Sequence, residues 1–374
     1  YGSVYMNKER LIDEFIELVQ IDSETMNEQQ IGPVIVEKMK SLGMEVTLDQ
    51  SQSKTGYGFD NVYGILKGND TSKKTVFFTT HMDTVTPGNG IKPIINNDYI
   101  ETDKTTILGA DDKAGIAACF ESIRHIQEQD IKHGDIEFVI TVGEESGLVG
   151  AKAFDESLIK ADFGYAVDGM GPIGTMVVQA PTQSKIKINI QGKKAHAGMA
   201  PEEGISAIEV ASLAVSNMPL GRINENTTAN IGTFIAEGPT NIVSDSVEII
   251  AEARSLIDEE MSDQVNKMEE AVKVACDQYN TTFTFEHEVM YPSFKYTEQD
   301  QVVSIAKNAT ERIGLEANII KAGGGSDGNV FSGKGKPTII LSVGYEDIHT
   351  TDEKMSIDRL VQVTEQISSI IEGM

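Results

Sequence analysis

The strongest constraint on the fold is a series of β-like runs, each of which ends abruptly in acidic residues or in histidine. The largely apolar run 136–142 is followed by the adjacent carboxylates Glu144 and Glu145, and two similar runs deliver His81 and Asp168. In open α/β sheets, ligands bind at the carboxyl ends of the strands. Neighbouring like charges repel each other, so the glutamate pair indicates either a cation-binding site or a solvated turn.

Helical and β-like patterns alternate over residues 6–181 and again over residues 291–374. Residues 8–19 and 28–42 carry apolar side chains at the spacing of amphipathic helices. The alternation predicts an α/β domain with a central mixed sheet flanked by helices. The five residues before Met6 resemble a remnant of an expression tag and are left out of this prediction.

The segment 182–290 follows a different order. Its pattern predicts a strand at 184–190, a helix at 204–218, strands at 228–236 and 246–253, a helix at 259–279 and a strand at 282–289. This βαββαβ order is typical of a ferredoxin-like unit, in which two helices cover one face of an antiparallel sheet. We therefore expect residues 6–181 and 291–374 to form one domain and residues 182–290 to form an inserted α+β domain.

The overall charge excludes several classes of partner. The 374 residues carry a net charge of -27, which repels nucleic acid and anionic lipid. We find neither an apolar stretch of the ~20 residues that span a bilayer nor a secretion signal. The two cysteines, Cys119 and Cys276, lie far apart in apolar helical patterns, which predicts free buried thiols in a reducing compartment. These features predict a cytoplasmic protein with no nucleic-acid or membrane partner.

Residues that can bind metals gather at the predicted strand ends and helix starts. They are His81, Asp83, Asp111, Glu144, Glu145, Asp168 and His349. Histidines mixed with carboxylates suit Zn²⁺, Co²⁺ or Mn²⁺. The set exceeds the three protein ligands that one catalytic ion needs, which favours two ions ~3.5–4 Å apart that share a carboxylate. Asp111 is the candidate bridge, because small residues precede it and a predicted helix follows it.

Several motifs together resemble the M20 family of dinuclear zinc peptidases, and within it the peptidase T-like (tripeptidase) branch. The motifs are Thr80-His81-Met82-Asp83, Gly109-Ala110-Asp111-Asp112-Lys113-Ala114-Gly115, Glu144-Glu145, Asp168, His349 and the loop Gly192-Lys193-Lys194-Ala195-His196-Ala197-Gly198. The likeness covers nearly the whole chain from about Met6. It implies a zinc-peptidase catalytic domain with the 182–290 insert as a lid and dimerisation domain.

The resemblance implies a role for each of these residues. His81 and Asp168 would bind one zinc ion, Glu145 and His349 the other, and Asp111 would bridge both. Glu144 would be the general base that activates a metal-bridging water, and Asp83 would orient His81. His196 would stabilise the oxyanion from the partner subunit of a homodimer. The Asp111–Asp112 peptide bond is often cis in this family.

Four further residues are candidates for substrate binding. Arg254 is a candidate for gripping the substrate carboxylate, with a surface charge or a salt bridge as the alternative. Asn241 is a candidate contact. Gly324 and Ser326 lie in a glycine-rich loop whose backbone N–H groups could cradle a carboxylate. A phosphate-binding loop is the rival interpretation, but no lysine follows the glycines as that motif requires.

The predicted function is dinuclear zinc-dependent hydrolysis of a peptide bond in short peptides, of the aminopeptidase or tripeptidase type. Two alternatives share the fold and the metal chemistry: an N-acyl-amino-acid amidohydrolase and a carboxypeptidase. A third alternative is a catalytically silent binding protein, although the presence of Glu144 argues against it. His196, in its alternative interpretation, is a surface histidine at a strand end.

Overall fold

The computed structural model describes residues 6–374, so the five residues before Met6 lie outside it. The chain divides into two compact units. Among the described residues, the first comprises 6–179 together with Lys295–Ala322 and Ser326–Met374, and the second comprises Ala180–Phe294 with Gly323–Gly325. The sequence pattern placed the corresponding boundaries at 181/182 and 290/291, within a few residues of this division.

A large mixed sheet runs through the first unit. Its order is β1 (Glu45–Leu48), β2 (Val62–Leu66), β6 (Ile136–Thr141), β3 (Val76–His81), β7 (Gly164–Gly169), β16 (Thr338–Ser342), β8 (Thr175–Ala180) and β14 (Phe294–Lys295), with β15 (Asn318–Lys321) paired to β8. The strands β6, β3, β7 and β16 are parallel to one another. Their buried runs contain mainly apolar residues, as expected for parallel strands that are covered on both faces.

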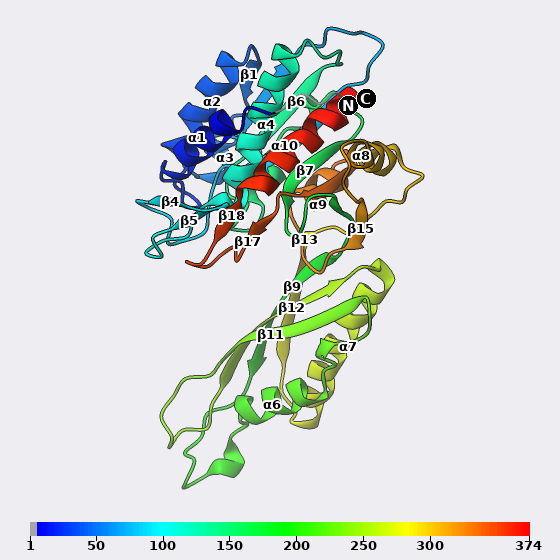
Figure 1. Cartoon of the computed structure of the whole chain (residues 1–374). Coiled ribbons are helices and arrows are strands. Elements are labelled where there is room, and N and C mark those ends of the chain that lie inside the picture. Colours follow the sequence, from blue (N-terminus) through cyan, green and yellow to red (C-terminus); the bar gives the residue numbers. More distant parts are fainter. Residues whose placement is uncertain (1–5) are drawn as a thin grey trace. The chain divides into compact units, whose positions relative to one another are not determined.

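Helices and a second, smaller sheet complete the first unit (Figure 1). The helices are α1 (Lys8–Val19), α2 (Ile31–Ser41), α3 (Gln52–Thr55), α4 (Ala110–Glu128), α5 (Val149–Ala153), α8 (Gln301–Arg312), α9 (Asp327–Gly333) and α10 (Ile357–Glu372), with a 3₁₀ turn at Glu156–Leu158. The small sheet has the order β17 (Tyr345–Glu346), β18 (Lys354–Ser356), β5 (Tyr99–Thr102) and β4 (Pro93–Asn96).

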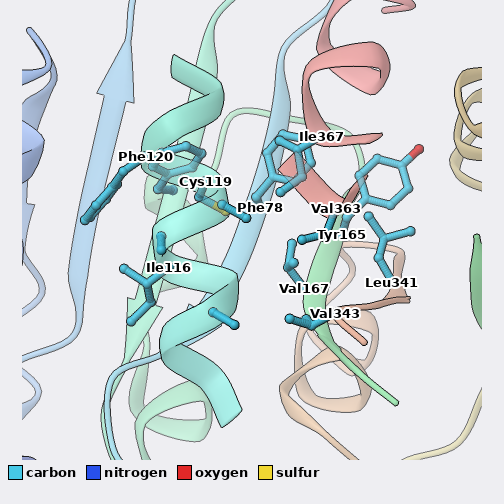
Figure 2. Packing of buried hydrophobic residues seen from close by; sticks show 14 of the residues in the cluster. Phe78, Ile116, Cys119, Phe120, Tyr165, Val167, Leu341, Val343, Val363 and Ile367 are labelled. Atoms are coloured by element: carbon cyan, nitrogen blue, oxygen red, sulfur yellow. The ribbon is translucent and has the colours of Figure 1, made fainter. Parts of the chain in front are cut away.

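The core of the first unit lies between its large sheet and the helices α4 and α10. Figure 2 shows Ile116, Cys119 and Phe120 of α4 in the same cluster as side chains from the sheet and from α10. Helix α4 is buried along most of its length, on several faces. Both cysteines are free and buried, as the sequence predicted. Among residues 6–374, no helix combines the length and the apolar character that crossing a membrane requires.

The second unit is the predicted ferredoxin-like unit. Its elements are β9 (Thr182–Gln191), a 3₁₀ turn at Pro201–Glu203, α6 (Ala207–Asn217), β10 (Gly221–Arg222), β11 (Thr227–Ile235), β12 (Ser246–Ser255), α7 (Asp258–Gln278) and β13 (Phe283–Tyr291). The sheet order is β10-β11-β12-β9-β13, and the pairs are antiparallel. Ile186, Ile188 and Ile190 alternate along β9 and belong to the same buried cluster as apolar residues of α6 and α7.

Some local features differ from the sequence-based prediction. The strand β8 was not predicted. The short helix α9 was not predicted either. Its sequence signal is a capping box between Ser326 and Asn329 and not a periodic pattern of apolar residues. The helix expected from residue 28 begins at Ile31. Glu28 is fully buried, and its carboxylate accepts the N–H groups of Gly58 and Gly143.

Candidate metal centre

The parallel strands of the first unit bring the predicted metal-binding residues to one edge of its sheet. His81 is the last residue of β3, and Asp168 lies next to the last residue of β7. Glu144 and Glu145 follow β6 after a short turn. Asp111 lies at the start of α4, and His349 lies in the loop between β17 and β18. Parallel strands end at the same edge, which is why separate segments meet here.

Asp111 lies between the two histidines. Its Oδ1 is 3.0 Å from His81 Nε2, and its Oδ2 is 3.1 Å from His349 Nε2. On one side, Asp168 Oδ2 is 3.4 Å from His81 Nε2. On the other, Glu145 Oε2 is 2.8 Å from His349 Nε2. The geometry therefore forms two potential ligand groups that share one carboxylate.

The ligand atoms within each of these two groups lie close enough together to bind one metal ion. In His81, Asp111 and Asp168, and separately in Asp111, Glu145 and His349, one ligand atom from each residue lies within 4.8 Å of the others. A third group of this kind combines His81 with Glu144 and Glu145. Imidazole nitrogens with carboxylate oxygens are suitable ligands for Zn²⁺, Co²⁺ and Mn²⁺, so the residues present fit a pair of divalent ions.

The electrostatics of the cluster favour bound cations. Burial lowers the pKa of His81, but the carboxylates of Asp168, Glu144 and Asp111 outweigh it and hold the pKa well above its usual range. Hydrogen bonds to Asp111 and Glu145 raise the pKa of His349 to about 10. The surrounding carboxylates thus favour positive charge in this cluster, whether on an imidazole or on a bound cation.

Glu144 lies beside these two ligand groups. Its Oε2 is 3.5 Å from His81 Nε2, and its side chain is 10% exposed. Burial raises its pKa well above the usual value for glutamate, and the carboxylates of Asp168, Glu145 and Asp327 add to this, although His81 opposes it. A carboxylate with a raised pKa holds a proton more readily near neutral pH, which suits a group that must both accept and return one.

Asp83 supports two parts of the site. His81 Nδ1 lies 2.9 Å from the main-chain oxygen of Asp83 and 3.3 Å from its carboxylate Oδ1. Of these two contacts, the shorter is the one to the main-chain oxygen. The Asp83 carboxylate also accepts the N–H groups of Glu144 at 3.0 Å and Glu145 at 3.1 Å. It therefore connects the strand end that bears His81 to the turn that bears the glutamate pair.

Three supporting residues were not identified from the sequence. Glu353 accepts the N–H groups of Leu108, Gly109 and Asp111. The hydroxyl of Tyr345 donates to the main-chain oxygen of Asp168 at 2.6 Å and to its Oδ1 at 2.9 Å, and Asp112 accepts the N–H group of His81. Burial raises the pKa of Glu353 to about 7, against the effect of the amides that it accepts. Their contacts are long-range, so no local pattern marks them. The Asp111–Asp112 peptide bond is cis.

The chain matches known proteins along nearly its whole length. The profile of peptidase family M20/M25/M40 matches residues 77–373. This chain belongs to that peptidase family. The crystal structure of aminopeptidase PepT from Bacillus cereus is 53% identical, with a TM-score of 0.95, and the match covers 98% of this chain and 99% of that one. A tripeptidase from Staphylococcus aureus is 46% identical with a TM-score of 0.96, and the match covers 99% of each chain. Peptidase T of Geobacillus thermodenitrificans is 29% identical over 97% of this chain and 98% of its own.

The M20 chain carries two of its predicted site residues side by side in the second unit. The loop bearing His196 pairs with the segment bearing Asn241: Ala197 N donates to Asn241 O at 2.9 Å, and His196 forms a β-bridge with Ile242. His196 Nδ1 accepts the N–H groups of Gly198 at 3.1 Å and Met199 at 3.0 Å. A neutral imidazole that accepts at Nδ1 carries its proton on Nε2 and presents that nitrogen as a donor.

Of the remaining predicted substrate residues, Arg254 and Ser326 have hydrogen-bond partners within the chain. Arg254 Nε lies 2.5 Å from Glu252 Oε2, and Arg254 Nη1 donates to the main-chain oxygen of Gly323 at 3.3 Å. The salt bridge weighed as an alternative for Arg254 is therefore present. Gly324 lies in the second unit next to this contact, while Ser326 belongs to the first unit and caps α9 through its hydroxyl.

Proposed function

We propose that this chain is a metal-dependent exopeptidase that removes the N-terminal residue of short peptides, and tripeptides in particular. The observation that carries the proposal is the position of Asp111, whose two oxygens face His81 and His349, with Glu144 at the edge of the cluster. The kinship to proteins named aminopeptidase PepT, tripeptidase and peptidase T supports the choice of substrate.

Two divalent ions are proposed to occupy the cluster, and zinc is the ion that the donor set suits best. His81 and Asp168 would hold one, Glu145 and His349 the other, and Asp111 would hold both. When bound, such ions acidify a water molecule and polarise the carbonyl of the scissile bond. They would also supply positive charge among these carboxylates.

Proton transfer is assigned to Glu144. Its carboxylate takes a proton from the attacking water and returns it to the nitrogen of the departing amine. In the metal-free protein, burial and neighbouring carboxylates raise its pKa, and bound cations would offset this effect and favour the ionised form that accepts the proton. Asp83 fixes the main chain on which Glu144 stands, since its carboxylate accepts the N–H groups of both glutamates.

The second unit is proposed to supply the contacts to the substrate. His196 presents Nε2–H, a donor suited to the oxyanion that forms when the carbonyl is attacked. Arg254 is proposed to bind the substrate carboxylate, with its bond to Glu252 holding the guanidinium in place. Asn241 and Gly324 of this unit, and Ser326 of the first unit, are proposed as further contacts. We also propose that the chain forms a homodimer through this unit, with His196 acting in the partner's site.

The location of the enzyme is proposed to be the cytoplasm. Both cysteines are free and buried, which agrees with a reducing compartment.

The dimer is tested by sedimentation of the purified protein together with activity across a dilution series. A species that remains monomeric at every concentration and is fully active would contradict the role of His196 in trans.

A substrate panel tests the peptidase assignment. Metal-loaded enzyme is incubated with free di- and tripeptides, with tripeptides acetylated at the N-terminus, with tripeptides amidated at the C-terminus and with N-acyl amino acids, and the products are identified by mass spectrometry. We expect the N-terminal amino acid from free tripeptides and no product from the acetylated ones. Release of the C-terminal residue would favour a carboxypeptidase, and cleavage of N-acyl amino acids alone would favour an amidohydrolase. A protein that binds these compounds without cleaving any would be a binding protein.

A further inference from the structure

We propose that Glu353 is a positioning residue that holds Asp111 in the orientation in which it serves both ligand groups. Glu353 lies four residues after His349, and its carboxylate reaches the turn before α4. Oε1 accepts the N–H groups of Leu108 and Gly109, each at 2.8 Å, and Oε2 accepts the N–H group of Asp111 at 3.1 Å. The inference rests on the metal centre proposed above.

One carboxylate thereby joins two segments that are distant in sequence. Asp111 and His349 are 238 positions apart. The loop of His349 ends in Glu353, and the N–H group of Glu353 closes this loop by donating to Thr350 O at 3.3 Å. Glu353 belongs to the loop of His349 and accepts the main-chain N–H group of Asp111. This hydrogen bond is therefore a second link between the two segments, beside the contact of the Asp111 carboxylate with the His349 imidazole.

The turn that Glu353 holds needs such support. Gly109 has φ of +82°, a left-handed conformation, and Asp111 itself departs from helical angles although it lies within α4. The N–H groups at the start of a helix have no partner in the helix itself. Glu353 is 1% exposed, so bulk water does not reach these N–H groups while a side chain of the same size fills the site. An unsatisfied buried N–H group would drive the turn to rearrange and would move Asp111 with it.

Only a carboxylate of this length meets all three N–H groups. In Glu353→Gln, the side chain keeps one acceptor oxygen and gains an NH₂ group, which faces either Asp111 N or the pair at Leu108 and Gly109, donor against donor. In Glu353→Asp, the charge and both oxygens remain, but the chain is one methylene shorter. The two variants therefore separate the loss of an acceptor from a change in reach.

The test is metal binding by the whole chain, measured without substrate. Wild type, Glu353→Gln, Glu353→Asp and the control Asp352→Asn are stripped of metal and titrated with Co²⁺ against a competing chelator, and visible absorption spectra are recorded at each point. Asp352 is a fair control because it is the neighbouring residue, its side chain is 67% exposed, and its partner is Lys104. Steady-state kinetics on a tripeptide and thermal unfolding of the metal-free forms accompany the titration.

We expect Glu353→Gln to bind Co²⁺ about 10–100-fold more weakly, the range found when a residue that supports a ligand is removed. Its Co²⁺ spectrum should differ from that of wild type at saturation, kcat should fall and KM should stay within about two-fold. Glu353→Asp should be intermediate, and Asp352→Asn should match wild type. A change in thermal stability alone would not support the proposal, because any buried residue can cause it.

The outcomes distinguish the positioning role of Glu353 from the metal centre itself. If Glu353→Gln is folded and has wild-type Co²⁺ affinity and spectrum, Glu353 does not position Asp111 and the inference is overturned. If Glu353→Gln does not fold, Glu353→Asp decides, and native affinity and spectrum in that variant would overturn it as well. If wild type itself binds no Co²⁺, the metal centre of the proposed function fails, whatever the variants do.

Discussion

The sharpest test of the site is Glu144→Gln. This change keeps the size of the side chain and removes its ability to accept a proton. Loss of a general base lowers kcat by ~10²–10⁴-fold. This range corresponds to ~2.7–5.4 kcal/mol in activation free energy, since each factor of ten is about 1.36 kcal/mol. The assay is release of the N-terminal residue from a free tripeptide, with the metal content of each preparation measured.

Glu144→Gln should preserve the stability and the metal content of the protein. The carboxylate of Glu144 lies near Asp168, Glu145 and Asp327, all of which raise its pKa. Its removal relieves repulsion in the metal-free protein, so the melting temperature of that form should stay level or rise. The predicted ligands all remain, so two metal ions should still bind. A low rate with native stability and full metal content is the pattern that assigns Glu144 to proton transfer.

Asp162→Asn is the matched control, because it also removes one carboxylate charge, from an exposed residue outside the cluster. It should have the kcat of wild type. The reasoning is refuted if Glu144→Gln, with both ions bound, keeps kcat within about ten-fold of wild type. A variant that loses metal would instead indicate that Glu144 is itself a ligand, as its place in the third potential ligand group would allow.

Four further predictions concern the site and the core. Asp111→Asn should weaken the binding of both ions, whereas Glu145→Gln should weaken the binding of one. Isothermal titration of the metal-free protein measures this, and equal losses of affinity in the two variants would argue against an Asp111 shared by both ions. Uptake of metal at pH 7 should release the proton of His349, whose pKa is raised to about 10, so affinity should increase with pH. The same raised pKa of His349 should stabilise the metal-free fold fully below about pH 6.5. This contribution to stability should decline as the pH increases through 10. It should be small because the side chain is half exposed, and His349→Gln should abolish it. Phe120→Ala should lower the free energy of unfolding by ~3–5 kcal/mol in urea titrations, because it leaves a cavity in the buried core; a loss below about 1 kcal/mol would contradict the packing in Figure 2.

The sequence predicted most of the regular structure because strong local patterns specify it. The βαββαβ order of the second unit is visible in alternating residues such as Ile186, Ile188 and Ile190, and these are buried in β9. The sequence did not predict α9, which lacks an apolar period and relies on a cap at Ser326. It placed the start of α2 too early at Glu28, because the side chain of Glu28 turns inward to accept the N–H groups of Gly58 and Gly143.

The sequence by itself determined which residues could form a metal site, since histidines and carboxylates follow predicted strands that end at one edge of a sheet. Tertiary structure decided how they meet. Only the fold places the two oxygens of Asp111 opposite His81 and His349, and only the fold brings Glu353 to the turn before α4. The physical reason is range: a strand end or a helix face depends on residues a few positions apart, whereas a shared carboxylate and its buried support depend on segments that meet when the chain has packed.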